Sequence, residues 1–394
     1  MTPSPELLIV GLTVFNLLYL FFVLALTDYF FSRSQHFGDP SSALPVSMII
    51  PVKGKDDGMF ENFVALCRQD YPCTQVIFVV GEPHDPAIPV LDQVIRDCPS
   101  SDILLVISSQ KIGTNEKVSN LEAGYQRARY DHLVFIDSDI RVGQDYLRKI
   151  IPPLADHRIG LVTCLPFYRD SRNVPAALET VGVNSNILSM YIPMFLLGKM
   201  NYGTGATLAI RRSMLEALGG FSKVADAVAD DAAIGQLVRK RGYTIYLSPY
   251  ILHTIHHEDS WGGYFYHTLR WSRTIRSVAP VAYTSFVFFF GTFYSFLYWI
   301  LNLRNIWAFL FFVFVSFTRI VMTAYYNDTS IKDPSTQQYL WLVPVRDLLI
   351  PLEWLLGFAG QTIRWRGNRY RILSGARIEK IAINGGLIRR LKEG

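Results

Sequence analysis

The sequence predicts an α/β domain with a mostly parallel sheet, placed between apolar segments long enough to cross a lipid bilayer. Short apolar runs alternate with helical patterns between residues 45 and 136, which is typical of parallel strands joined by helices. The 394 residues are 50% hydrophobic and 14% aromatic, yet 18% are charged. This composition is too apolar for an ordinary soluble enzyme and too charged for a wholly embedded protein. We therefore expect the apolar segments to be separate from a water-facing domain.

The N-terminal apolar run, residues 7–31, is almost uncharged and long enough to span a bilayer. It lacks a basic start and a small-residue cleavage site, so residues 1–32 are predicted to be a transmembrane anchor and not a removable signal peptide. Arg33, Lys53 and Lys55 follow the run, whereas no basic residue precedes it. The positive-inside rule then places the next domain, residues 33–281, on the cytosolic side.

Four strands and three helices are expected in the first part of that domain. The strands are predicted at 45–52, 75–80, 102–108 and 133–136, and the helices at 60–68, 89–97 and 115–128. Ligands of such sheets bind beyond the carboxyl ends of the strands. Lys53, Asp85 and Asp137 all follow strand ends, so we expect them to lie close together.

Two carboxylates separated by one serine, Asp137 and Asp139, end the fourth strand. Such a pair suits a hard divalent cation, Mg²⁺ or Mn²⁺, whose other ligands would be waters and a substrate diphosphate. The alternative is a solvated strand end, because Asp is common in turns. A second pair, Asp230 and Asp231, opens a predicted helix that runs to Lys240. Acidic residues there could simply complement the helix dipole.

Two later segments suit contact with the membrane. Residues 183–200 are apolar, contain Pro193, and are expected to lie at the membrane surface or to line an apolar groove. Residues 261–276 form an amphipathic pattern rich in aromatic residues and arginine, which suits the interface. The four cysteines lie in the polar middle of the chain without metal-type pairing, which indicates reduced thiols on a cytosolic face. His253, His256 and His257 do not have a clean zinc-ligand pattern.

The C-terminal part, residues 282–360, is predicted to hold further membrane segments. Two spans are expected, at 282–301 and 306–325. A third apolar run, residues 339–359, contains Arg346 and Asp347 as well as two prolines. We expect it to be re-entrant or buried in the bundle, with this pair bonded to each other or to polar neighbours. A fourth full span is the alternative.

Residues 361–394 carry nine basic residues against two acidic ones, in a chain of net charge +5. This basic tail, expected in the cytosol, is either solvated or disordered, or it binds anionic lipid head groups. Nucleic acid is not an expected partner, since no recognition module is present.

Polar elements follow one another in a suggestive order: Asp85, Asp137-Ser-Asp139, Asp230-Asp231 and His267-Thr-Leu-Arg270-Trp271. The order resembles the inverting GT-A glycosyltransferases, which carry three aspartate motifs and a (Gln/Arg)-x-x-Arg-Trp box. Nearly the whole chain more closely resembles the ceramide glucosyltransferase family. The matching strings are Asp70-Tyr-Pro72, His84-Asp-Pro-Ala-Ile88, Asn115-x-Lys117-x-x-Asn120-Leu121, Asp137-Ser-x-Ile-Arg-Val142, Gly160-Leu-Val162, Leu165-Pro166, Ala229-x-Asp231, Arg241-Gly242, Arg270-Trp271 and Trp365-Arg-x-x-Arg369-Tyr-Arg371. Two departures are His267, where the family has Gln or Arg, and Asp139, where ceramide enzymes tend to have Gly.

The resemblance implies a GT-A fold and a membrane enzyme that moves glucose or N-acetylglucosamine from a UDP-sugar to a lipid hydroxyl, such as that of ceramide. Bacterial relatives that modify hopanoids leave the acceptor open. The implied base is Asp231, with Asp230 orienting it or raising its pKa. The implied metal ligands are Asp137 and Asp139, and the implied donor-binding residues are Lys53, Asp85, Lys117, Asp137, His267, Arg270 and Trp271.

Two other functions remain open. A processive polysaccharide synthase is disfavoured by the few clear spans and by the missing Gln of the box. A catalytically silent membrane scaffold is disfavoured by the intact Asp137, Asp139 and Asp231.

Overall fold

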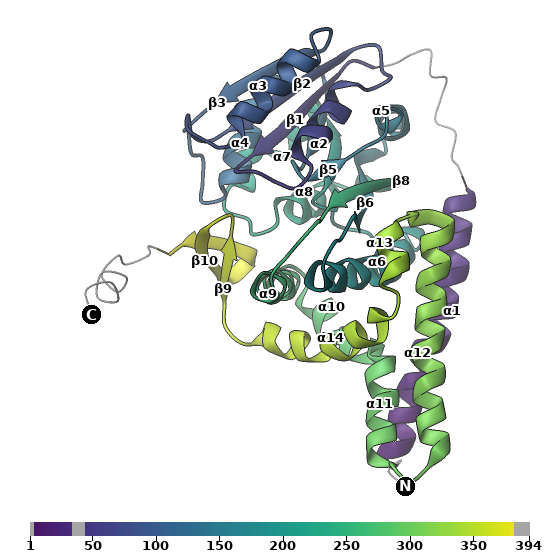
Figure 1. The fold of residues 1–394 in the computed structure, drawn as a ribbon. Coiled ribbons are helices and arrows are strands. Elements are labelled where there is room, and N and C mark those ends of the chain that lie inside the picture. The colour runs from purple at the N-terminus through teal and green to yellow at the C-terminus, as the bar shows by residue number, and fades with distance from the viewer. Residues whose placement is uncertain (1–3, 34–43, 382–394) are drawn as a thin grey trace.

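A computed structural model describes residues 4–33 and 44–381, so residues 382–394 of the predicted tail lie outside the described residues. The central sheet has eight strands: β1 (Val46–Val52), β2 (Thr74–Val80), β3 (Asp102–Ile107), β4 (His132–Ile136), β5 (Ile140–Arg141), β6 (Ile159–Arg169), β7 (Thr207–Arg211) and β8 (Thr244–Ile255). Their order is β3-β2-β1-β4-β7-β6-β8-β5. Strands β3, β2, β1 and β4 are parallel neighbours, as are β6 and β8, whereas β7 runs antiparallel between β4 and β6. The expected mostly parallel sheet is confirmed (Figure 1).

Helices cover both faces of this sheet. They are α2 (Met59–Cys67), α3 (Ile88–Asp97), α4 (Glu116–Tyr125), α5 (Tyr146–Ile150), α7 (Arg212–Leu218) and α8 (Asp230–Lys240). Alternate residues of one strand enter different cores: Ile49 packs with residues of α4, α7 and α8, whereas Met48 and Ile50 pack with residues of α2, α3 and α5. This alternation follows from the two-residue period of a strand, and it confirms that the strands are buried on both faces.

Three helical segments extend away from the sheet side by side (Figure 1). Helices α1 (Pro5–Ser32) and α12 (Ile306–Tyr326, extended by a π-turn to Ile331) are long and apolar enough to cross a membrane. The third is not the straight span expected at 282–301. Helix α10 (Pro280–Ser285) and a 3₁₀ turn meet α11 (Gly291–Leu301) at a bend of 46°. The side-chain amide of Asn16 donates to the Phe289 carbonyl over 3.1 Å, which satisfies a backbone group freed by the bend.

Helix α14 (Leu342–Phe358), the third apolar run, lies across the direction of α11 and α12 and packs on α6 (Val174–Leu196) and α9 (Trp261–Val278) (Figure 1). Its charged residues are paired with polar neighbours, which confirms one of the two expected arrangements. Asp347 binds Arg319 of α12 over 2.8 Å, and Arg346 binds Glu353 over 2.7 Å. Arg319, Asp347 and Glu353 are buried and the Arg346 side chain is 13% exposed, so none of these charges is left without a partner.

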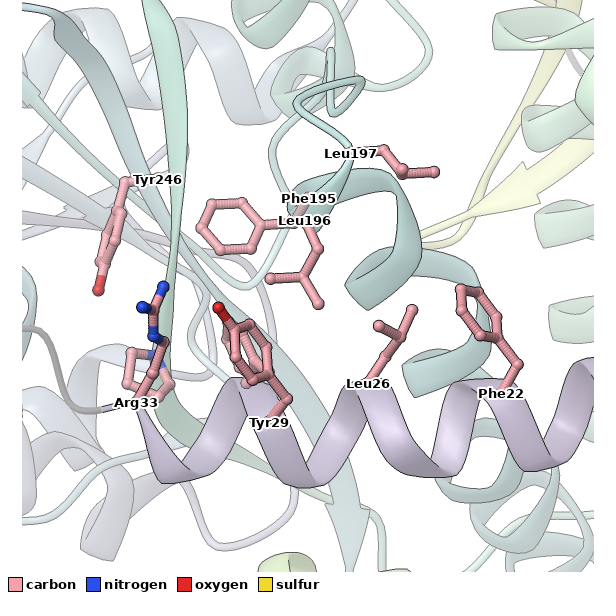
Figure 2. A pocket seen from close by; sticks show the side chains of 10 residues that line it. Phe22, Leu26, Tyr29, Arg33, Phe195, Leu196, Leu197 and Tyr246 are labelled. Carbon is pink, nitrogen blue, oxygen red and sulfur yellow. The ribbon is translucent and has the colours of Figure 1, made fainter.

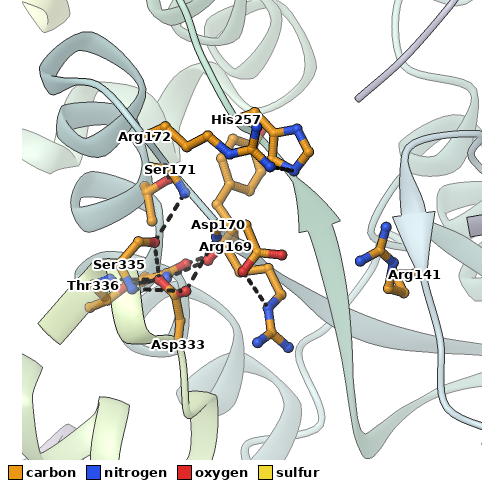
Figure 3. Close-up of polar contacts among 12 residues, drawn as sticks. Arg141, Arg169, Asp170, Ser171, Arg172, His257, Asp333, Ser335 and Thr336 are labelled. Carbon is orange, nitrogen blue, oxygen red and sulfur yellow. Dashed lines mark hydrogen bonds and ion pairs between the residues drawn. The ribbon is translucent and has the colours of Figure 1, made fainter. Parts of the chain in front are cut away.

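The short helix α13 (Pro334–Gln338) fastens the membrane segments to the end of β6. Its N-cap, Asp333, accepts hydrogen bonds from the backbone N–H groups of Thr336 (2.6 Å) and Asp170 (3.3 Å). The Ser335 hydroxyl accepts one from the Ser171 N–H over 3.2 Å (Figure 3). The loop after β6, next to α6, is thereby fixed against the α12–α13 connection.

The described part of the basic tail is folded. Strands β9 (Thr362–Trp365), β10 (Asn368–Leu373) and β11 (Arg377–Lys380) form a small antiparallel sheet. Ile363, Tyr370, Ile372 and Ile378 bury one face of it against Val228, just ahead of α8. The expectation of a disordered or merely solvated tail is wrong for these residues, because alternate apolar side chains make a core that the net charge conceals.

Candidate active site

Asp137 and Asp139 lie where β4 ends, at the edge of the sheet that also holds the ends of β1 and β2. The N–H of Asp137 donates to the Ala206 carbonyl over 3.2 Å, and the Ser138 hydroxyl donates to Asp56. Burial, together with the nearby charges of Asp137 and Asp56, raises the pKa of Asp139 to about 7. A group of crowded carboxylates at a strand end is an arrangement that a cation would relieve.

Lys117 lies between the two aspartate pairs, Asp137-Ser-Asp139 and Asp230-Asp231. Its amino group lies 2.7 Å from Asp137 and 3.5 Å from Asp230. Burial lowers the pKa of Lys117, but the two carboxylates outweigh burial and raise it, so the amine stays charged. The lysine is held by the start of α4, where the Asn115 side chain caps the helix and also donates to the Ala227 carbonyl over 2.9 Å.

Asp230 and Asp231 are adjacent but have different surroundings. The Asp230 side chain is 7% exposed and faces Lys117. Asp231 lies against the glycine loop that precedes β7: its carbonyl accepts from the Gly203 N–H over 3.4 Å, and a Cβ on Gly205 would lie 3.4 Å from its carboxylate. Burial, and then repulsion by Asp230, raises the pKa of Asp231 to about 7. Such a value suits a group that accepts a proton near neutral pH.

A small pocket opens beyond the ends of β1, β2 and β3, lined by Lys53, Asp85, Glu116 and Asn120 among others. The carboxylate of Asp85 accepts from the backbone N–H groups of Gly54 (3.1 Å) and Ala87 (2.9 Å), so it orders the loop after β1. Lys53 forms an ion pair with Glu116. The structure thus brings Lys53 and Asp85 to the same edge of the sheet as Asp137, in the way that strand order predicts.

His267 is the first residue of the His267-Thr-Leu-Arg270-Trp271 box, which lies on α9. One ring nitrogen, Nδ1, contacts the buried carboxylate of Glu179, and the other, Nε2, lies 2.6 Å from the Arg270 guanidinium and 3.1 Å from the Trp271 indole N–H. If Nδ1 carries the proton, Nε2 accepts from both neighbours. Burial raises the pKa of Glu179, but His267 and His256 outweigh burial and lower it, so Glu179 stays a carboxylate.

No role in the site was predicted from the sequence for three residues of this region: Asp56, Glu179 and Arg366. Glu179 is the single acidic residue in the apolar helix α6, and that isolation is a signal that could have found it. Asp56 follows β1, and Arg366 belongs to the tail string that carries the family resemblance.

Glu179, His256 and Asp259 place ligand atoms within 4.8 Å of one another, a spacing that could hold a metal ion. The carboxylate of Glu179 already faces both His267 and His256, the latter at 3.5 Å. We therefore assign Glu179 to the hydrogen-bonded network around His267 and not to a metal.

A mostly parallel sheet with aspartates gathered at its carboxyl edge, attached to helices apolar enough to cross a membrane, is the arrangement expected of a membrane-associated glycosyltransferase of the GT-A class. The family model of glycosyl transferase family 21 matches residues 12–378, and the chain belongs to this family.

Relatives cover nearly the same range. Ceramide glucosyltransferase 1 of Caenorhabditis elegans is 23% identical over 93% of this chain and 80% of its own length. Ceramide glucosyltransferase 3 of the same organism is 24% identical over 94% of this chain and 82% of its own. Among solved structures, the mannosyltransferase PcManGT from Pyrobaculum calidifontis is 18% identical, covers 87% of this chain and 98% of its own, and aligns with a TM-score of 0.49.

Proposed function

We propose that the protein transfers glucose or N-acetylglucosamine from a UDP-sugar to the hydroxyl of a membrane lipid such as ceramide, with inversion at the anomeric carbon. The observation that carries this proposal is the convergence of Asp137, Asp230 and Asp231 on Lys117, with Asp139 beside Asp137. Helix α6, which packs on α1, α12 and α14, also lies near Asp231 through Tyr191. Membership of family 21 and the ceramide glucosyltransferase relatives support it.

Asp231 is the proposed general base. An acceptor hydroxyl approaching the sugar from the face opposite the diphosphate needs a carboxylate that takes its proton as the new bond forms. The pKa of Asp231 is raised, whereas the carboxylate of its neighbour Asp230 faces Lys117. We therefore propose different roles for the two carboxylates. Asp230 positions Lys117 and adds the negative charge that keeps Asp231 basic.

The residues at the end of β4 fit a hard divalent cation. Asp137 and Asp139 offer carboxylate oxygens, the ligands that Mg²⁺ and Mn²⁺ prefer, and burial together with neighbouring carboxylate charges raises the pKa of Asp139. When bound, such an ion supplies charge neutralisation for the departing diphosphate. Lys117 adds a fixed positive charge at Asp137. Arg270, held by His267, offers a planar fork for phosphate oxygens.

The acceptor is proposed to arrive from the membrane. An apolar groove of about 370 Å³ lies between the end of α1 and the end of α6 (Figure 2). Phe22 and Leu26 line it from α1, and Phe195 and Leu196 from the end of α6. The groove is also connected to the helix that carries the base: Met194, next to Phe195, accepts from the Tyr202 hydroxyl, and the Gly203 N–H donates to the backbone carbonyl of Asp231. Alkyl chains favour such a surface over water by about 0.8 kcal/mol per CH₂.

A lipid-transfer assay tests the function. Purified protein is incubated with Mn²⁺, a membrane lipid extract and radiolabelled UDP-glucose or UDP-N-acetylglucosamine, and the products are separated by thin-layer chromatography. A labelled lipid that needs both Mn²⁺ and Asp231 is the expected product. Insoluble labelled polymer would instead identify a polysaccharide synthase, and absence of any product would favour a scaffold.

A further inference from the structure

The hairpin of β9 and β10 carries a charged residue at an unusual backbone position. Its two turn residues, Arg366 and Gly367, have φ of 46° and 79°. Two-residue turns with positive φ at both positions match the twist of a hairpin, but the first position is rarely given to a long side chain. This turn therefore presents an arginine at the tip of the hairpin, at a place where Asn or Asp would be less strained.

The guanidinium of Arg366 enters the edge of the sheet that holds the aspartate motifs. Both terminal nitrogens pair with the carboxylate of Asp56, one of them at 3.0 Å, and one also donates to the Lys53 carbonyl over 3.2 Å. Asp56 in turn accepts from the Ser138 hydroxyl, between Asp137 and Asp139. Arg366 also interacts electrostatically with those two aspartates.

The small sheet of β9, β10 and β11 that carries the hairpin is fastened in this position from several sides. Lys380 binds Glu116 over 2.9 Å, next to Lys117. The Val228 N–H donates to the Ala376 carbonyl over 2.8 Å, two residues before Asp230. Arg273 of α9 donates to the Ala359 carbonyl over 2.8 Å. The small sheet and the residues that flank it thus contact α4 next to Lys117, the segment before Asp230, and helix α9.

We propose that Arg366 binds the diphosphate of the nucleotide donor and that the hairpin is a fixed wall of the donor site. This inference rests on the proposed function. A guanidinium binds two phosphate oxygens in the geometry with which it binds a carboxylate, so Arg366 exchanges Asp56 for the diphosphate. Its side chain is 37% exposed, which leaves it accessible to a ligand. The positive charge stabilises the leaving diphosphate as it gains negative charge.

The experiment measures UDP binding by calorimetry, with Mn²⁺, on the full chain in detergent. Arg366→Ala is expected to weaken UDP at least tenfold, because a charge-assisted pair of hydrogen bonds to the diphosphate is lost. Uridine, which lacks the diphosphate, should bind the variant and the unchanged protein alike. Arg371→Ala is the matched control, since it removes an exposed arginine of the same hairpin, and it should leave both affinities unchanged.

A purely structural clasp between Arg366 and Asp56 gives a different pattern. It would lower the melting temperature of Arg366→Ala and of Asp56→Asn equally, while UDP affinity in Arg366→Ala stays within twofold of the unchanged protein; that result overturns the inference. Arg366→Lys, which keeps a charge but not the fork, should bind UDP with intermediate affinity, and it serves if the alanine variant does not fold. If the unchanged protein binds no UDP, the proposed function fails, and this inference fails with it.

Discussion

Two adjacent carboxylates, Asp230 and Asp231, have different neighbours, and we proposed different roles for them on that ground. Replacing Asp231 by Asn keeps its shape but removes the proton acceptor. We expect transfer to fall by about 10²–10⁴-fold, the usual contribution of a general base, while UDP binding is unchanged. Loss of UDP binding in this variant would contradict the assignment.

The raised pKa of Asp231 gives the same prediction a pH dependence. A base works only when it is deprotonated, so the single-turnover rate should fall as pH drops below about 7, the pKa of Asp231. Above that value the rate should level off. At saturating Mn²⁺, which keeps Asp139 deprotonated, the residual rate of Asp231→Asn should lack this titration. A profile that is the same in both proteins would assign the proton acceptor to another residue.

The carboxylates at the end of β4 are predicted to act on the donor and not on the acceptor proton. Asp137→Asn or Asp139→Asn removes a ligand charge and should weaken Mn²⁺-dependent UDP binding itself. Calorimetry with UDP and Mn²⁺, repeated after addition of EDTA, measures the effect. If both variants bind UDP as tightly as the unchanged protein, the metal site is elsewhere.

Among the secondary-structure elements, α6 contributes both a buried carboxylate and an end that lines the apolar groove. Leu196 lines the groove, and Leu197 lines it too but is 68% exposed. Leu196→Ser should raise KM for the lipid by about fivefold, which corresponds to a loss of about 1 kcal/mol of binding free energy. KM for the UDP-sugar should not change. Leu197→Ser should have a smaller effect in the same direction, and Leu303→Ser, in the α11–α12 loop, should have none. Equal changes in both KM values would argue against lipid entry here.

The N-cap of α13, Asp333, is predicted to stabilise the junction between the sheet domain and the apolar helices. Asp333 is buried and accepts hydrogen bonds from Ser335 and Thr336 as well as from Asp170. Asp333→Ala should lower the free energy of unfolding by about 2 kcal/mol, because several buried donors lose their acceptor. Asp328→Ala, an exposed acid in the preceding turn, should leave the melting temperature unchanged.

Sequence patterns predicted the elements whose environment is local. The strand that ends in Asp137 is a buried apolar run, and strand order alone brings Lys53, Asp85 and Asp137 to one edge. The role of Glu179 was not predictable, because its contact with His267 joins residues 88 apart in the chain. The same is true of Arg366 and Asp56, which are 310 residues apart. Such contacts depend on how α9 and the C-terminal sheet pack on the rest of the molecule, and the periodicity of the sequence does not predict that packing.

On the scale of the whole molecule, the docked C-terminal sheet limits the paths that the predicted membrane segments can take. Residues 362–380 contact the catalytic domain through the Ala227–Arg377 bridge and the Lys380–Glu116 ion pair. They therefore lie on the same side of the membrane as that domain. If α10 and α11 leave this side and α12 returns to it, α14 must begin and end on it. The re-entrant or interfacial path of α14 is thus favoured over a fourth span.

The side itself is predicted to be the cytosol, since basic residues follow the anchor and none precedes it. A cysteine in a C-terminal tag should be modified by a membrane-impermeant maleimide only after lysis. Arg304→Cys, in the exposed loop between α11 and α12, should be modified in intact cells, because that loop lies on the opposite side. The exposed Cys73 is replaced by serine in both proteins.

Modification of the tag before lysis, with Arg304→Cys protected, would reverse the orientation. Modification of both before lysis would mean that α14 crosses the membrane and that the C-terminal sheet does not dock on the catalytic domain.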